Sequence, residues 1–102
     1  MVTKQRVKTL SSITQILNSE KSKLFPKFGI KRLEIFGSYA RGEQSLSSDL
    51  DVIVEFNKPI GIEFIDLGNQ LEKLLKIKVE LVSMAGIKRK YINVIKSEIR
   101  YI

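Results

Sequence analysis

The chain of 102 residues contains no cysteine and no histidine. Disulfides, Cys/His zinc sites, Ser-His-Asp triads and Cys-His nucleophilic pairs are therefore excluded within it. A metal ion would have to be held by oxygen ligands, which favours Mg²⁺ or Mn²⁺. The sequence also has no apolar run near the roughly 20 residues of a membrane span, and residues 1–6 lack the apolar core of a secretory signal. We expect a cytoplasmic protein.

Acidic residues are in the minority, with 11 Asp and Glu against 18 Lys and Arg, which gives a net charge of +7. Such a balance favours anionic partners such as nucleotides, RNA or an acidic protein, although a solvated surface explains it equally well. No aromatic residues are interleaved with the basic ones as a platform for stacked bases. The length suits one small domain with no separate region for recognising an acceptor.

The most informative stretch is an apolar run that stops at Gly37-Ser38 and is followed, after a polar spacer, by Asp49-Leu50-Asp51. Because strand side chains alternate, Asp49 and Asp51 share one face of the second strand while Leu50 points to the core. Two carboxylates held so close repel each other unless a cation lies between them. The pattern therefore predicts a divalent metal ion at these aspartates.

The Gly37-Ser38 turn can bring backbone N–H groups and a hydroxyl close to an anion, because glycine has no side chain to keep the anion away. Phosphate on one side and metal on the other describe a site for a nucleoside triphosphate. Simpler interpretations remain open: Gly37 only ends a strand, Ser38 is a helix N-cap, Asp49 caps a turn and Asp51 belongs to a solvated strand face.

Hydrophobic periodicity predicts alternating helices and strands and a compact α/β sandwich. The first helix should cover much of residues 4–24 and end before Pro26, because proline breaks helices. The last helix should carry the apolar positions from Ile87 to Ile99. Between them we expect strands at 30–36, 49–56 and 78–82, helices at 39–43 and 62–75, and a turn at 57–61.

The words GSYARGE and SSDLDVIV make the sequence resemble the polymerase-beta-like nucleotidyltransferase superfamily, and within it the minimal nucleotidyltransferase (MNT) antitoxins that partner HEPN-domain toxins. The matching motif is Phe36-Gly37-Ser38, a spacer of ten residues, 39–48, and the Asp-x-Asp of the next strand. The resemblance runs from about Leu33 to Val82. It implies one nucleotidyltransferase domain over residues 1–102, with a mixed sheet of at least three strands packed with helices.

The resemblance also implies residue roles. Gly37 and Ser38 would hold the phosphates of ATP, and Arg41 would lie near the triphosphate or the acceptor. Asp49 and Asp51 would bind two Mg²⁺ or Mn²⁺ ions, with Glu80 as the third carboxylate where many relatives carry Asp. Two simpler interpretations remain open. Glu80 could be a solvated residue of an edge strand, and Arg41 could pair with Glu43 or with the aspartates.

Three functions follow as alternatives. The leading one is transfer of AMP from ATP to a hydroxyl, implied by the resemblance to be a tyrosine of a HEPN toxin. The second is a non-catalytic module that neutralises the partner by capping it, which the Glu at position 80 favours. The third is nucleotidyl transfer to RNA or to a small molecule, where the net charge favours RNA and disfavours cationic drugs.

Overall fold

The computed structural model describes residues 8–58, 61–84 and 100–102. Its elements follow in the order α1 (Leu10–Phe28), β1 (Ile30–Phe36), α2 (Gly37–Arg41), β2 (Leu50–Phe56), α3 (Glu63–Leu75), β3 (Val79–Ser83) and β4 (Arg100–Tyr101). The strands form one sheet in the order β3-β2-β1-β4. The pair β2/β3 is parallel and the other two pairs are antiparallel, so the expected mixed sheet is confirmed.

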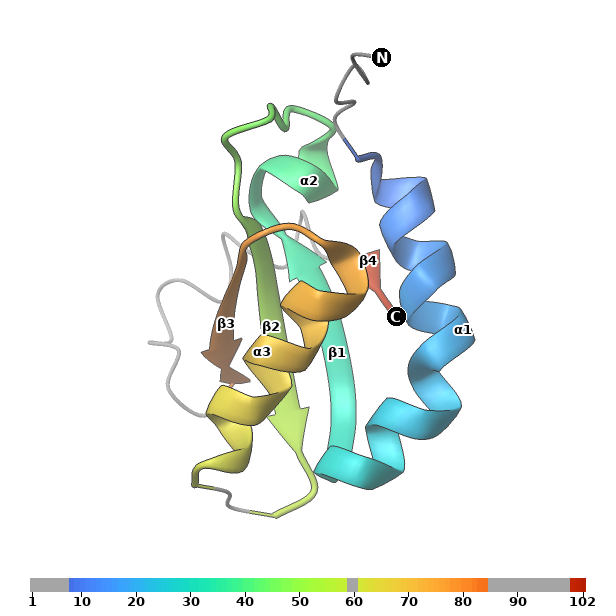
Figure 1. Cartoon of the computed structure of the whole chain (residues 1–102), viewed down its shortest axis with the longest axis vertical. Helices are drawn as coiled ribbons and strands as arrows, with labels where there is room; N and C mark the ends of the chain where they lie inside the picture. The colour runs from blue at the N-terminus through green and yellow to red at the C-terminus, as the bar shows by residue number, and fades with distance from the viewer. Residues whose placement is uncertain (1–7, 59–60, 85–99) are drawn as a thin grey trace, which may run out of the picture.

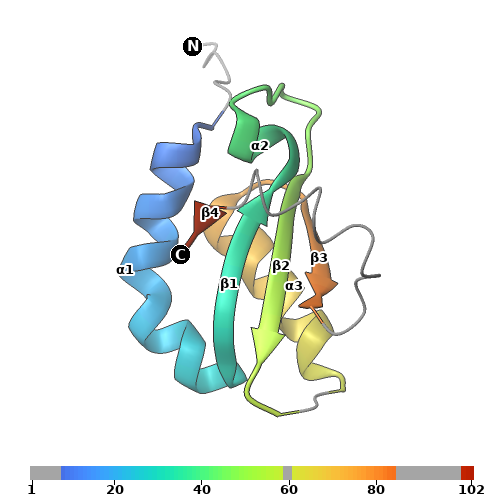
Figure 2. The same ribbon diagram turned by 180° about the vertical axis from the view of Figure 1, so that it is seen from behind.

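Helices α1 and α3 pack on the same face of the sheet (Figure 1), and the view from behind shows the strands in front of them (Figure 2). The core between these two layers is built from alternate strand residues, such as Leu33, Ile35, Val52 and Val54, and from the apolar stripes of the helices. In α3 that stripe consists of Leu67, Leu71 and Leu75, each fully buried, as the helical spacing predicts.

Helix α1 extends further at its C-terminal end than the sequence predicts. The helix continues through Pro26 to Phe28 and ends at Gly29, which takes the left-handed conformation with φ of 65°. Pro26 lies in the last turn and has no N–H to donate to the carbonyl four residues before it, so the helix loses one hydrogen bond there. Burial of Phe28 in the core offsets that loss, so tertiary packing outweighs the local signal of the proline.

At its N-terminal end α1 begins at Leu10, so it covers most of the predicted residues 4–24. Thr9 is the N-cap: its side chain accepts a hydrogen bond from the Ser12 backbone N–H, and the Thr9 backbone N–H donates to Ser12 Oγ. Lys8 therefore lies outside the helix. The other helices and strands begin or end within two residues of their predicted bounds, and α2 starts at Gly37 rather than at Tyr39.

Strand β4 was not predicted from the sequence. It pairs with β1 through Glu34↔Tyr101 and Ile35↔Arg100. The predicted last helix, from Ile87 to Ile99, and residues 1–7 lie outside the described residues, as does part of the predicted turn at 57–61. Within the described part of the chain, no helix has the length and apolar character needed to cross a bilayer.

Candidate nucleotide-binding site

The Gly37-Ser38 turn and Asp51 are brought together by the antiparallel pairing of β1 and β2. The register places Phe36 opposite Asp51, so the turn begins beside the aspartate. A Cβ built on Gly37 would collide with Asp51 Oδ2 and lie 3.2 Å from Asp51 Cγ. Gly37 also has a φ of 73°, which disfavours every side chain. Both the backbone angle and the close approach of Asp51 therefore require glycine here.

Asp51 and Glu80 are neighbours across the parallel strands β2 and β3, where they form a register pair. Their side chains share the sheet face that points away from α1 and α3. Burial raises the pKa of the Asp51 carboxyl, and the charges of Glu80 and then Asp49 raise it further, whereas Arg41 lowers it. The electrostatic cause is the like-charge repulsion that the sequence pattern predicts.

Asp49 lies one residue before β2 rather than inside it. Asp49 is half-buried. Burial raises the pKa of the Tyr39 hydroxyl in α2, and the negative charge of Asp49 raises it further. The structure thus brings Asp49, Asp51, Glu80 and Gly37 to one end of the sheet. That end is the meeting point of the C-terminal end of β1 with the N-terminal ends of β2 and β3.

Ser38 is not a helix N-cap, so that simple interpretation was wrong. Phe36 is the N-cap of α2 and makes no side-chain capping bond, while Ser38 lies inside the first turn. The Ser38 carbonyl accepts hydrogen bonds from the N–H groups of Gly42 and Glu43, which closes the helix. The Ser38 side chain makes no hydrogen bond within the described residues that competes with an incoming ligand.

Arg41 forms the ion pair that the sequence offered as an alternative to nucleotide binding. Its Nε donates to Glu43 Oε2 at 3.1 Å, and both side chains are largely exposed. Such a pair is worth little and breaks easily. Arg41 is also close enough to Asp51 to lower the pKa of that carboxyl, so the same side chain lies within electrostatic range of the acidic group.

The acidic residues fit a hard divalent cation by their chemistry. No three of the carboxylates in the described ranges converge tightly enough to form a ready-made metal site. Asp51 nevertheless has two negative neighbours, and a cation between them would relieve the repulsion that raises its pKa. Carboxylate oxygens are the ligands that Mg²⁺ prefers. Asp49, Asp51 and Glu80 are therefore the residues that would hold it.

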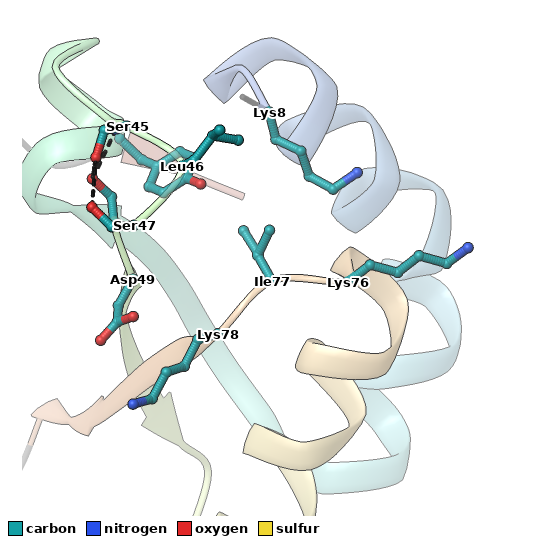
Figure 3. Close-up of a pocket in the computed structure, with 10 residues that line it drawn as sticks. Lys8, Ser45, Leu46, Ser47, Asp49, Lys76, Ile77 and Lys78 are labelled. Carbon is teal, nitrogen blue, oxygen red and sulfur yellow. Dashed lines mark hydrogen bonds between the residues drawn. The ribbon is translucent and has the colours of Figure 1, made fainter. Parts of the chain in front are cut away.

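A pocket of about 470 Å³ adjoins Asp49, and the sequence gave no pattern for it. Three segments surround it: the start of α1, the α2–β2 loop and the α3–β3 loop (Figure 3). Apart from Asp49, its lining residues are Lys8, Tyr39, Ser45, Leu46, Ser47, Ser48, Lys76, Ile77 and Lys78. Their proximity depends on how loops pack, which no local spacing encodes.

Glu34 is a second feature that sequence reasoning missed. It lies on β1, on the sheet face away from the helices, and only 1% of it is exposed. Neither carboxylate oxygen has a hydrogen-bond partner among the described residues, and the Nε of Arg32 lies 3.7 Å from Oε1. Burial raises the pKa of this carboxyl, Arg32 lowers it, and Glu55 raises it.

The comparisons with known proteins agree on one family of proteins. Residues 13–102 match the model of the nucleotidyltransferase domain. The protein adenylyltransferase MntA of Thermococcus cleftensis is 37% identical over 95 residues, which cover 92% of this chain and 96% of the relative. A solved structure described as a candidate minimal nucleotidyltransferase is 28% identical, with a TM-score of 0.82, and covers 96% of this chain and all of that one.

A third similarity concerns the fold alone. The structure of a tri-AMPylated HEPN toxin of Shewanella oneidensis in complex with an MNT antitoxin has a TM-score of 0.62 to this chain. The identity is 19%, and the match covers 85% of this chain and 69% of the other.

Proposed function

Because this chain belongs to the nucleotidyltransferase domain family, we propose that it transfers AMP from ATP to a tyrosine hydroxyl of a HEPN-domain toxin and thereby acts as its antitoxin. The observation that carries this proposal is the grouping of Gly37, Asp51 and Glu80 at one end of the sheet. Resemblance to an enzyme named as a protein adenylyltransferase supports the protein acceptor.

Asp49, Asp51 and Glu80 would hold two Mg²⁺ ions. When bound, the ions stabilise the charge on the attacking and leaving oxygens of the phosphoryl transfer. Gly37 leaves room for phosphate beside Asp51, since its missing Cβ keeps the backbone N–H groups accessible. Ser38 offers a hydroxyl next to it, and Arg41 can leave Glu43 to meet the triphosphate.

Glu80 is the residue best placed to take the proton of the acceptor. It is exposed, and it lies at the outer strand of the sheet, on the far side of Asp51 from the phosphate-binding turn. In the balanced reaction the acceptor oxygen forms a bond to the α-phosphorus and the bond to pyrophosphate breaks. Glu80 then holds the proton that leaves the acceptor hydroxyl.

The proposed partner follows from the comparisons. The described residues form one sheet with its helices, and we place the docked acceptor on this domain. The Shewanella oneidensis structure described above pairs an MNT antitoxin with an AMPylated HEPN toxin, and it shares this fold.

The test is to incubate the protein with ATP, Mg²⁺ and the HEPN protein encoded beside it. We expect the partner to gain about 329 Da per AMP, the mass added by adenylylation, at a tyrosine mapped by mass spectrometry. Transfer should stop when a chelator removes the metal. Labelled AMP on RNA with an unmodified partner would contradict the proposal and favour an RNA substrate.

Steric capping without catalysis is a second candidate, because Glu80 stands where many relatives carry Asp. The extra methylene moves the carboxylate by roughly an ångström, and a positioned group can lose much of its effect over such a distance. If capping is the mechanism, the protein neutralises its partner equally well without ATP, and the partner keeps its mass.

A further inference from the structure

We propose that the pocket beside Asp49 is the docking groove for the acceptor-bearing segment of the partner, and that it selects an apolar side chain flanked by acidic residues. For brevity we call it the acceptor groove; it is lined by residues 45–49 and 76–78 together with Lys8 and Tyr39. This inference rests on the proposed function, since it assigns a place to the protein substrate of that reaction.

The walls of the acceptor groove are fixed by hydrogen bonds. Gln44 Nε2 donates to the Lys8 carbonyl at 2.9 Å, which ties the α2–β2 loop to the start of α1. On the other wall, the Leu50 N–H donates to the Lys78 carbonyl at 2.8 Å. The Val79 N–H donates to Glu72 Oε2 at 2.9 Å. A groove held open in this way can bind a segment at a low entropic cost.

The lining of the acceptor groove combines two aliphatic side chains, Leu46 and Ile77, with hydroxyl groups and lysines. Leu46 is 64% exposed, one of three large hydrophobic residues in the described chain that are mostly in water. Ile77 points into the space below Leu46 and Lys8 (Figure 3). Lys78 extends toward the side of Asp49, whereas Lys76 extends in the opposite direction, away from residues 45–49 (Figure 3). Three lysines against one aspartate favour an acidic segment.

The position of the acceptor groove matches the geometry of the reaction. Asp49 belongs both to the groove lining and to the acidic group, so the groove adjoins the candidate site at this residue. The turn at the end of β1 lies on one side of Asp51, and β3, which carries Glu80 and is preceded by Lys78, lies on the other. A segment held along the β3 side would reach the site opposite the triphosphate.

The experiment compares matched surface substitutions. Leu46→Asp removes the apolar contact and repels an acidic segment, and Ile65→Asp makes the same change at a residue of α3 that is 63% exposed and does not line the groove. Lys76→Glu and Lys23→Glu form a second pair, with Lys23 exposed on α1. All four side chains are exposed, so folding should be unaffected, and unfolding temperatures check this.

Two readouts are needed. The first is the affinity for the HEPN protein encoded beside the chain, measured without ATP. The second is KM for that protein during AMP transfer, with KM for ATP measured alongside. We expect Leu46→Asp and Lys76→Glu to weaken partner affinity and raise its KM at least tenfold, with KM for ATP unchanged. The two control variants should stay within about twofold of the parent.

Partner affinity equal to that of the parent in both groove variants overturns the inference, whatever happens to transfer. If the parent binds the partner without transferring AMP, the proposed reaction fails while the affinity measurement still tests the groove. No binding of the partner by the parent, or a tenfold loss of affinity for a labelled single-stranded RNA in the groove variants alone, overturns the assignment of a protein segment.

Discussion

The carboxylate of Asp51 occupies the space into which a Cβ on Gly37 would project. Gly37→Ala should therefore displace Asp51 and abolish AMP transfer. Gly29→Ala is the matched control, because Gly29 also has a positive φ, 65°, but nothing lies within 4 Å of its added Cβ. Both variants should lose about 1 kcal/mol of unfolding free energy to backbone strain. Only Gly37→Ala should lose transfer, and equal activity in the two variants would contradict the contact.

Metal binding at Asp49 and Asp51 should be visible in stability. Without metal, the double variant Asp49→Asn/Asp51→Asn should unfold at a slightly higher temperature than the parent, because the repulsion that raises the pKa of Asp51 is relieved. Adding Mg²⁺ at a hundred times its dissociation constant should stabilise the parent by about 2.7 kcal/mol and leave the variant unchanged. Glu20→Gln on α1 controls for the loss of a carboxylate. An equal Mg²⁺ response in all three proteins would remove the metal assignment.

Substitution of Glu80 tests whether the third carboxylate is catalytic. Glu80→Gln should lower the transfer rate roughly 10²-fold, the usual scale for losing a general base, while Mg-ATP affinity falls much less. Glu80→Asp keeps a carboxylate at this position and is the matched control, so it should retain transfer. A Gln variant as fast as the parent would mean that Glu80 is a solvated residue of strand β3.

The buried Glu34 should make the free energy of unfolding depend on pH in an unusual way. Within the described part of the chain its buried carboxylate accepts no hydrogen bond, so Glu34→Gln should raise the unfolding free energy at pH 7 by about 1 kcal/mol. Burial raises the pKa of Glu34 in the folded state. The free-energy cost of burying its charged carboxylate therefore appears in the parent as the pH rises through that pKa, and it is absent below the unfolded-state value near 4.5. The difference between the two proteins should therefore shrink as the pH falls toward 4.

Denaturant titrations at pH 7 and pH 4 measure this difference. Glu55→Gln serves as the control, because Glu55 shares Arg32 with Glu34 but is only half-buried. If Glu34→Gln raises the unfolding free energy equally at both pH values, the charge of Glu34 is not responsible for the effect.

Strands β1, β2 and β3, and the placement of Gly37, Asp51 and Glu80 at one end of the sheet, were predictable because their signals are local. The alternation of Asp49, Leu50 and Asp51 fixes which side chains face the core, and the glycine at position 37 ends β1 where predicted. Strand alternation also places Glu80 on the face of the aspartates, and the observed register makes it the neighbour of Asp51.

What the sequence did not reveal depends on contacts between distant segments. Pro26 indicated a helix end, but the burial of Phe28 extends α1 by another turn. The acceptor groove depends on Gln44 reaching Lys8, a contact between residues 36 positions apart that no spacing rule contains. Strand β4 has only two residues and pairs with β1, so it carries no periodicity of its own.

The mixed sheet also bears on the order in which the site forms during folding. The hairpin of β1 and β2, with the loop between them, carries Gly37 and both aspartates, and its paired residues are closer in sequence than those of β2 and β3, so it can assemble first. Glu80 reaches Asp51 only after the α3 crossover has laid β3 against β2. The hairpin that carries Gly37 and Asp51 and the strand that carries Glu80 therefore come together in separate steps, and the acidic pair is complete only once the parallel pairing has formed.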